Sequence, residues 1–168
     1  SAIPQYDRYV FNPKLFLYFN EQTKLNFAVN STIENRLGGD MAFIEGKGDS
    51  IRSYFEENNT QRYSTQLTFD HKFNENSFFQ FKNSFSYYNR AISVPGYTFE
   101  GTQKATFSEA SYSNNKEKSE WIIGLNLWTD DFTENKIDTF QTRSYDLTTF
   151  GAFAQNSWKT TDWLNLET

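Results

Sequence analysis

The chain has 168 residues, a net charge of −5, and 18 Phe, 10 Tyr and 4 Trp, which make 19% of it aromatic. This length suits a single domain, and aromatic residues favour half-buried strands over helices, so the composition excludes an all-helical protein. The longest uninterrupted apolar run, residues 15–19, is far shorter than the roughly 20 residues of a membrane-spanning helix.

The residues needed for several kinds of chemistry are missing from the sequence. It contains no cysteine, which excludes disulfides and thiolate metal sites, and its single histidine, His71, leaves no imidazole pair for a metal. The acids Asp130, Asp131, Glu134 and Asp138 lack the spacing of a calcium loop. The acidic balance disfavours nucleic acid as a partner. We therefore expect no enzyme activity, no cofactor and no metal site.

Apolar and polar residues alternate with a period of two along residues 15–34. Residues 15–19 and 25–34 predict two strands joined by a tight turn near residue 22. The clearest alternation covers residues 62–73, and a second stretch at residues 79–87 follows the turn residues Asn74-Glu75-Asn76. Because successive side chains point to opposite faces of a strand, this hairpin has one aromatic face and one polar face.

Two more hairpins are predicted downstream, with tight turns near residues 116 and 161. Their strands cover residues 104–112 and 121–127, then residues 150–158 and 163–166. In the first of these hairpins the alternation slips between Phe107 and Tyr112, which predicts a bulge or a shifted register within residues 104–113.

Longer segments separate the four hairpins. Glycines and acids fill residues 37–59, Val94-Pro95-Gly96 lies within residues 91–97, and residues 130–143 are polar and charged. We expect three long loops there, within one all-β domain, residues 1–168, that is an antiparallel up-and-down meander of about eight long strands.

Strand length and the placement of aromatic residues indicate a transmembrane β-barrel. Residues 62–73 span about 40 Å as a strand, whereas globular strands usually have about 5–6 residues. Aromatic side chains gather near strand ends, as in the girdles of membrane barrels, and the opposite face is polar. Two alternatives stay open: a small eight-stranded outer-membrane barrel, and a soluble β-sandwich that acts as a binding module.

Residues 150–166, FGAFAQNSWKTTDWLNL, resemble a barrel hairpin of TonB-dependent outer-membrane receptors. A looser match pairs residues 37–41 with residues 54–58. The resemblance implies a segment of a large transmembrane β-barrel, about a third of one, in the bacterial outer membrane, which imports a ferric chelate, cobalamin or a similar nutrient. The implied partners are outer-membrane lipid, the receptor's own plug domain, which is absent from this chain, and the TonB complex.

Two sets of candidate site residues follow from this interpretation. Exposed aromatic residues of the long loops are candidates for ligand contact, although packing within the loops is the commoner role of such residues: Tyr54, Phe55, Tyr97, Phe99 and Phe132. Polar residues of the alternating strands are candidates for the barrel lumen: Arg62, Gln66, Asp70, Lys72, Lys82 and Arg90.

Overall fold

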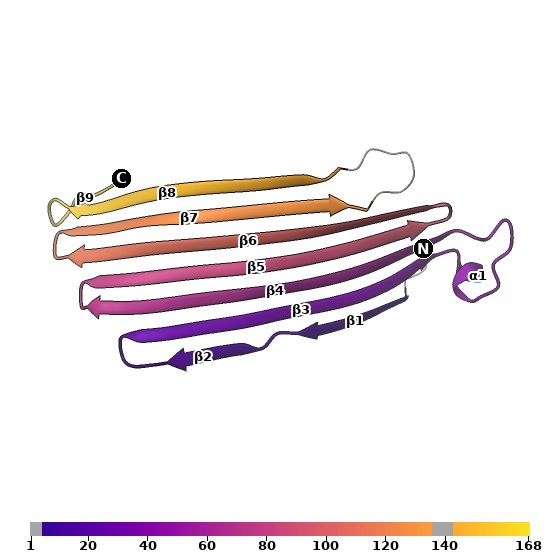
Figure 1. Cartoon of the computed structure of the whole chain (residues 1–168), viewed down its shortest axis with the longest axis horizontal. Coiled ribbons are helices and arrows are strands. Elements are labelled where there is room, and N and C mark those ends of the chain that lie inside the picture. The colour runs from indigo at the N-terminus through magenta and orange to yellow at the C-terminus, as the bar shows by residue number, and fades with distance from the viewer. Residues whose placement is uncertain (1–4, 136–142) are drawn as a thin grey trace.

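A computed structural model describes residues 5–135 and 143–168 of the chain, and the strands in these ranges form a single antiparallel sheet (Figure 1). One short helix, α1 (Met41–Ile44), accompanies nine strands. These are β1 (Gln5–Phe11), β2 (Lys14–Tyr18), β3 (Thr23–Gly39), β4 (Phe55–Asn74), β5 (Ser77–Val94), β6 (Tyr97–Lys116), β7 (Ser119–Glu134), β8 (Tyr145–Lys159) and β9 (Asn165–Glu167).

The sheet is an up-and-down meander in which β3 to β8 each pair with the next strand in the chain. β1 and β2 both pair with β3, on either side of Asn12-Pro13, so the nine strands occupy eight positions across the sheet. The prediction of an all-β antiparallel meander is therefore confirmed. β1 was not predicted, because its alternation is broken by the charged pair Asp7-Arg8.

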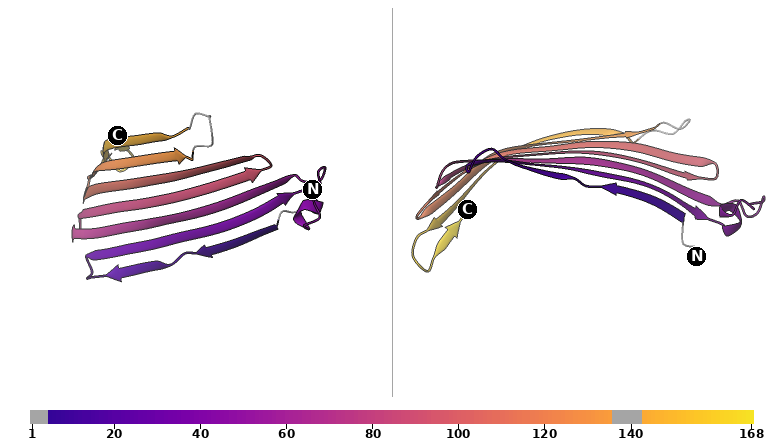
Figure 2. Two further views of the ribbon diagram at one scale, coloured as in Figure 1. Left: turned by 45° about the vertical axis from the view of Figure 1, so that its right-hand side comes forward. Right: turned by 90° about the horizontal axis from the view of Figure 1, so that it is seen from below.

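The sheet is open and has one layer, arched along its strands (Figure 2). Among the described residues, Ala28 is the only buried hydrophobic side chain. The chain exposes 12162 Å², whereas a folded monomer of its mass exposes about 8,600 Å² by the usual scaling. The described strands thus do not form the second layer that a β-sandwich requires.

The first expected loop, residues 37–59, is shorter than predicted. β3 continues to Gly39, which pairs with Phe55 at the start of β4, so the connection covers only residues 40–54. Gly39 has φ +134°, and a Cβ there would lie 2.4 Å from the carbonyl oxygen of Tyr54. Gly38 and Gly39 were read as loop residues, but glycine permits this close pairing at the strand end. Asp40 then caps α1 by accepting a hydrogen bond from Ala42 N at 2.8 Å.

The prediction of a second long loop at residues 91–97 is wrong. β5 runs to Val94 and β6 begins at Tyr97, so Pro95-Gly96 alone connects them. Proline presets its own φ for a turn and Gly96, at φ +78°, supplies the positive φ that follows, which makes a two-residue hairpin turn.

The third expected loop, residues 130–143, is shorter than predicted because β7 continues to Glu134. Residues 136–142 of this segment lie outside the described part of the chain.

The bulge expected within residues 104–113 is also wrong. β6 pairs with β5 and β7 in an unbroken register through this segment. The alternation slips in the sequence because Phe107 points to one face of β6 and Tyr112 to the other, so both faces carry aromatic side chains. The register shift that does occur lies between Lys72 and Asn74, beside the β4–β5 turn.

Candidate functional site

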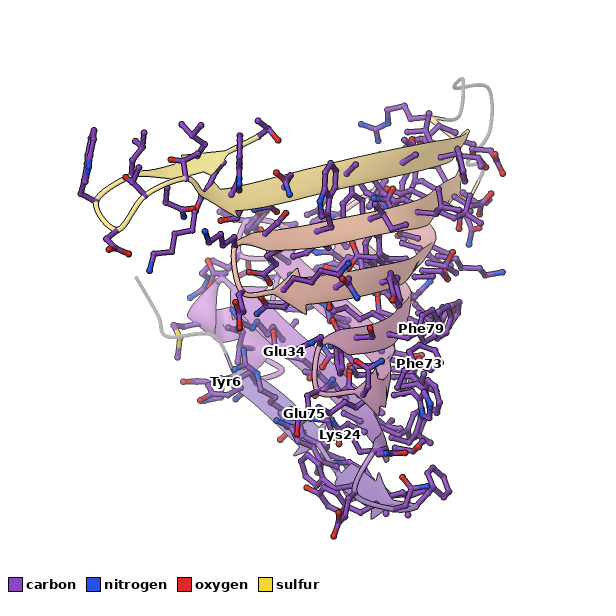
Figure 3. All side chains as sticks on the ribbon, turned by 90° about the vertical axis from the view of Figure 1, so that its left-hand side faces the viewer. Tyr6, Lys24, Glu34, Phe73, Glu75 and Phe79 are labelled. Atoms are coloured by element: carbon purple, nitrogen blue, oxygen red, sulfur yellow. The ribbon has the colours of Figure 1, made fainter. Side chains whose placement is uncertain are left out.

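The strand register assigns each side chain to one of two faces. Directly paired residues point the same way, so Asp70 of β4 shares a face with Lys24 of β3 and Gln80 of β5. Phe69 shares the other face with Leu25 and Phe81. In Figure 3, Phe73 and Phe79 stand on the side of the sheet opposite to Tyr6 and Glu34. With the arch of Figure 2, this makes the first of these faces concave and the second, aromatic face convex.

The convex face carries an apolar band in the half of the sheet near the tight turns. Its members come from β2, β3, β4, β5, β7 and β8 and include Leu17, Leu25, Leu67, Phe69, Phe81, Phe85, Ile123, Leu125, Leu127 and Phe150. On β4 the band runs from Tyr63 to Phe73, which is about 33 Å along the strand. Beyond Tyr63 the same face is polar, with residues such as Gln61, Asn59, Asn89, Thr102 and Asp146.

Aromatic rings mark both margins of this band. At one margin, Tyr63 and Tyr87 pair across β4 and β5 with ring centroids 6.0 Å apart. At the other, Phe73 and Tyr112 lie 6.2 Å apart, and Trp121 and Trp158 extend the same margin over β7 and β8. Both tryptophans are about half exposed. The convex face thus has an apolar band that aromatic rings border on both sides, with polar residues beyond the margin at Tyr63 and Tyr87.

Polar residues inside the band bond to one another. Asn83 Nδ2 donates to Ser108 Oγ at 2.8 Å, and the hydroxyls of Thr106 and Thr129 are 2.6 Å apart. Because each pair joins two neighbouring strands on the convex face, these groups do not depend on water for their hydrogen bonds.

All six candidate lumen residues lie on the concave face. Asp70, the most buried of them, is 4% exposed; Lys24 Nζ lies 3.3 Å from one of its oxygens and Gln80 Nε2 donates to the other at 2.8 Å. Lys82 pairs with Glu109 of β6 at 3.1 Å. Gln66 and Lys72 are exposed. Register thus places the six side chains on one surface, as the alternation predicted.

Arginines gather in the other half of the concave face. Arg8 and Arg36 both bond to Glu34, and Arg36 also lies over the ring of Tyr6, 5.8 Å from its centroid. Figure 3 shows Tyr6 and Glu34 on this side of the sheet. These contacts fix two of the guanidinium groups close to a carboxylate.

The two arginines of the candidate lumen set, Arg62 and Arg90, have uncharged partners among the described residues. Arg62 lies over the ring of Tyr88, with its guanidinium carbon 4.8 Å from the ring centroid. Arg90 Nε donates to Asn58 Oδ1 at 3.1 Å.

The candidate ligand-contact residues do not form one site. Tyr97, Phe99 and Phe132 lie within strands on the concave face rather than in loops. Phe55 is on the convex face and stacks on Phe43 of α1 with centroids 4.8 Å apart. Tyr54 lies in the loop, where its carbonyl oxygen accepts a hydrogen bond from Asp40 N at 2.9 Å.

An aromatic and polar cluster on the concave face includes residues that the sequence did not single out. Phe132 stacks on Tyr145 with centroids 5.5 Å apart, and its ring packs against the backbone of Gly101. Gln103 Nε2 donates to both Asp130 oxygens, at 2.9 and 3.0 Å. Tyr145 and Gln103 were missed because no alternating stretch had been assigned to those residues; the cross-strand pairing of β6, β7 and β8 brings them together.

An ion pair joins the end of β7 to the start of β8. Arg143 donates to Glu134 through a terminal amino group at 2.7 Å, through Nε at 3.0 Å and through its backbone N at 2.7 Å. The hydrogen bonds from the Arg143 side chain and backbone lower the pKa of Glu134 to about 2. Arg143 also lies 5.5 Å from the centre of the Phe99 ring.

The concave face is not polar throughout. Over β6 to β8 it carries Phe107, Trp128, Leu147 and Phe153, and Phe107 pairs directly with Trp128. Trp128 and Leu147 are each more than half exposed. This apolar patch is the counterpart of the slipped alternation in the sequence.

The acids weighed as calcium ligands do not converge. Asp130 points to the concave face and Asp131 to the convex face, while Asp138 lies outside the described residues. Within residues 5–135 and 143–168, no group of three or more His, Asp or Glu side chains has a geometry that could hold a metal ion.

No helix in these ranges is long and apolar enough to span a membrane.

Comparison with known proteins leaves the chain without an assigned family. No protein-family model matches the sequence, and no curated protein matches it either.

Proposed function

We propose that this chain forms part of the wall of a TonB-dependent outer-membrane transporter that imports a nutrient such as a ferric chelate or cobalamin. The observation that carries the proposal is the apolar band of the convex face. A strand length of about 33 Å, tilted by about 40° as barrel strands are, covers about 25 Å of membrane thickness. This equals the height of the lipid-facing band of outer-membrane barrels.

The concave face supports the same proposal. Its paired charges, such as Lys82 with Glu109, suit a surface that faces an aqueous lumen, where polar side chains keep their hydration. The aromatic residues at both margins of the convex band suit the two interfaces of a membrane. The TonB-dependent class and its nutrient come from the resemblance of residues 150–166.

Closure is the further requirement of this proposal. The sheet formed by the described residues is open, and unpaired backbone groups in hydrocarbon cost several kcal/mol each. A barrel wall must therefore pair its edge strands, which are β1 with β2 on one side and β8 with β9 on the other.

Spin labels on adjacent residues test the proposal. The chain contains no cysteine, so each introduced cysteine gives a single site for a label within it. The positions are Phe81 and Leu125 on the convex face, and Lys82 and Asn126 on the concave face. In the full-length protein in lipid vesicles, labels at Phe81 and Leu125 should collide often with oxygen, which dissolves in hydrocarbon. Labels at Lys82 and Asn126 should collide with it much less.

Two results would contradict the proposal. Labels at Phe81 and Leu125 that contact neither oxygen nor a water-soluble nickel complex would lie in a dry protein core instead of lipid. A full-length protein that does not sediment with outer membranes, or does not bind the periplasmic domain of TonB, would refute the transporter assignment.

A further inference from the structure

The arginines of the chain divide into two groups by their partners. The sequence has six arginines, and four of them form ion pairs with carboxylates: Arg8, Arg36, Arg52 and Arg143. Within the described residues, Arg62 and Arg90 instead contact an aromatic ring and an amide. Because a guanidinium is charged at all ordinary pH values, these two carry positive charge without an ion pair to any carboxylate in residues 5–135 and 143–168.

The two arginines are neighbours on the concave face. Arg62 pairs with Tyr88 and Arg90 pairs with Thr60, so the arginines are diagonal neighbours on adjacent strands β4 and β5. Such neighbours have Cα atoms about 7–8 Å apart, within reach of long side chains. Both arginines therefore belong to one stretch of the concave face.

Each guanidinium is held in place while its donors stay available. The Tyr88 ring supports Arg62 through its face, which leaves the N–H groups at the edge of the guanidinium free to donate. The bond to Asn58 occupies Nε of Arg90 and leaves its two terminal amino groups. A planar fork of donors that is already oriented loses little entropy when it binds a carboxylate or a phosphate.

The surrounding residues favour an anion. Glu34, the nearest acid on the β3 side, is already held by Arg8 and Arg36. On β4, Glu56 lies four residues from Thr60, about 13 Å along the strand. Ser64 and Ser86 pair in the next row of the concave face and add hydroxyl groups beside Arg62.

We propose that Arg62 and Arg90 form a binding site for an anion that carries carboxylate or phosphate groups. This inference rests on the proposed function in one respect: in a transporter it gives the chemical class of the compound that passes this part of the wall. The binding itself depends only on the two guanidinium groups and their supports.

Calorimetric titration of the full-length protein with citrate and with pyrophosphate tests the site and separates the two anion classes. We expect saturable binding of at least one probe at low salt. The double variant Arg62→Gln/Arg90→Gln should weaken it roughly tenfold or more, because it removes charge-assisted hydrogen bonds. Arg52→Gln, an arginine paired with Asp49 in the loop after α1, should leave the affinity unchanged.

The controls distinguish failure of the site from failure of the proposed function. Equal affinity in the wild type and the double variant, with unchanged folding by heat-dependent gel mobility, would overturn the site. Absence of binding of both probes to the wild type would also overturn it. Loss of binding in the double variant of a protein that is not in the outer membrane would support the site and refute the transporter.

Discussion

Glycines on the concave face lie beneath side chains of neighbouring strands. Gly124 of β7 pairs with Phe153 of β8, and a Cβ at position 124 would lie 2.4 Å from Cζ of that ring. Gly151 lies beneath Asn126 in the same way, with a Cβ 2.4 Å from Oδ1. The absence of side chains at these points lets larger neighbours lie flat on the inside of the arch.

The substitution Gly124→Ala should therefore destabilise the protein by about 1–3 kcal/mol, because the Phe153 ring and the carbonyl oxygen of Ala110 both crowd the new methyl group. Gly151→Ala is the matched control, and it should cost less because the amide end of Asn126 can move. Urea unfolding of the full-length protein measures both. Equal midpoints for the two variants, or no recovery when Gly124→Ala is combined with Phe153→Leu, would contradict this explanation.

At the scale of elements, the strands extend further than expected, and an ion pair joins the ends of two of them. Glu134 is the last residue of β7 and Arg143 lies just before β8, so their ion pair holds the two strand ends together. A carboxyl group whose pKa is lowered by folding stabilises the protein above its ordinary pKa, and that contribution is lost as the pH falls through the lowered value. For Glu134 this window lies between 4.5 and about 2.

The variant Arg143→Gln should return the pKa of Glu134 toward its ordinary value of 4.5. At pH 3, Glu134 should then be largely protonated in the variant and largely ionised in the wild type. Carbon-13 spectra of labelled glutamate side chains follow this titration directly. An unchanged midpoint would mean that the backbone hydrogen bond from residue 143 is sufficient to hold the carboxylate charged.

The alternation of residues predicted the strands well because it depends only on which face a side chain occupies. Arg62, Gln66 and Asp70 are separated by even numbers of residues, and this spacing alone placed them on one face of the strand. The same method missed the Pro95-Gly96 turn, since proline and glycine mark both loops and two-residue turns. It also misjudged Phe99 and Phe132, whose loop assignment followed from where the strands were expected to end. Their actual neighbours depend on pairing between strands distant in sequence, which no local pattern reveals.

At the scale of the molecule, a single sheet leaves both edges unpaired. The edge of β8 between residues 146 and 155 has no partner strand among the described residues, and neither do the outer edges of β1 and β2. Exposed edges of long strands pair readily with other chains. The chain also exposes more surface than a compact monomer, including many large apolar side chains, and this favours association with other chains as well.

The isolated chain should therefore associate in buffer without detergent. Ala152→Lys places a charge on the apolar side of the edge strand β8 and should reduce the oligomeric fraction in light scattering. Ser84→Lys, with the same added charge on the concave face of the central strand β5, is the matched control and should have little effect. A wild-type chain that remains a dilute monomer with a sharp melting transition would contradict this prediction.

Beyond Tyr63, on the side of the sheet away from the tight turns, the convex face is polar, and this bears on which parts of the proposed transporter lie at the cell surface. From Tyr63 to Phe55, β4 continues past the apolar band for about 26 Å along the strand, or about 20 Å in height at barrel tilt. If the longer loops face outward, as they do in outer-membrane barrels, this part of the wall rises among the sugar chains that coat the cell. Antibodies and phages would then meet the flank of the sheet itself, together with the loop around α1.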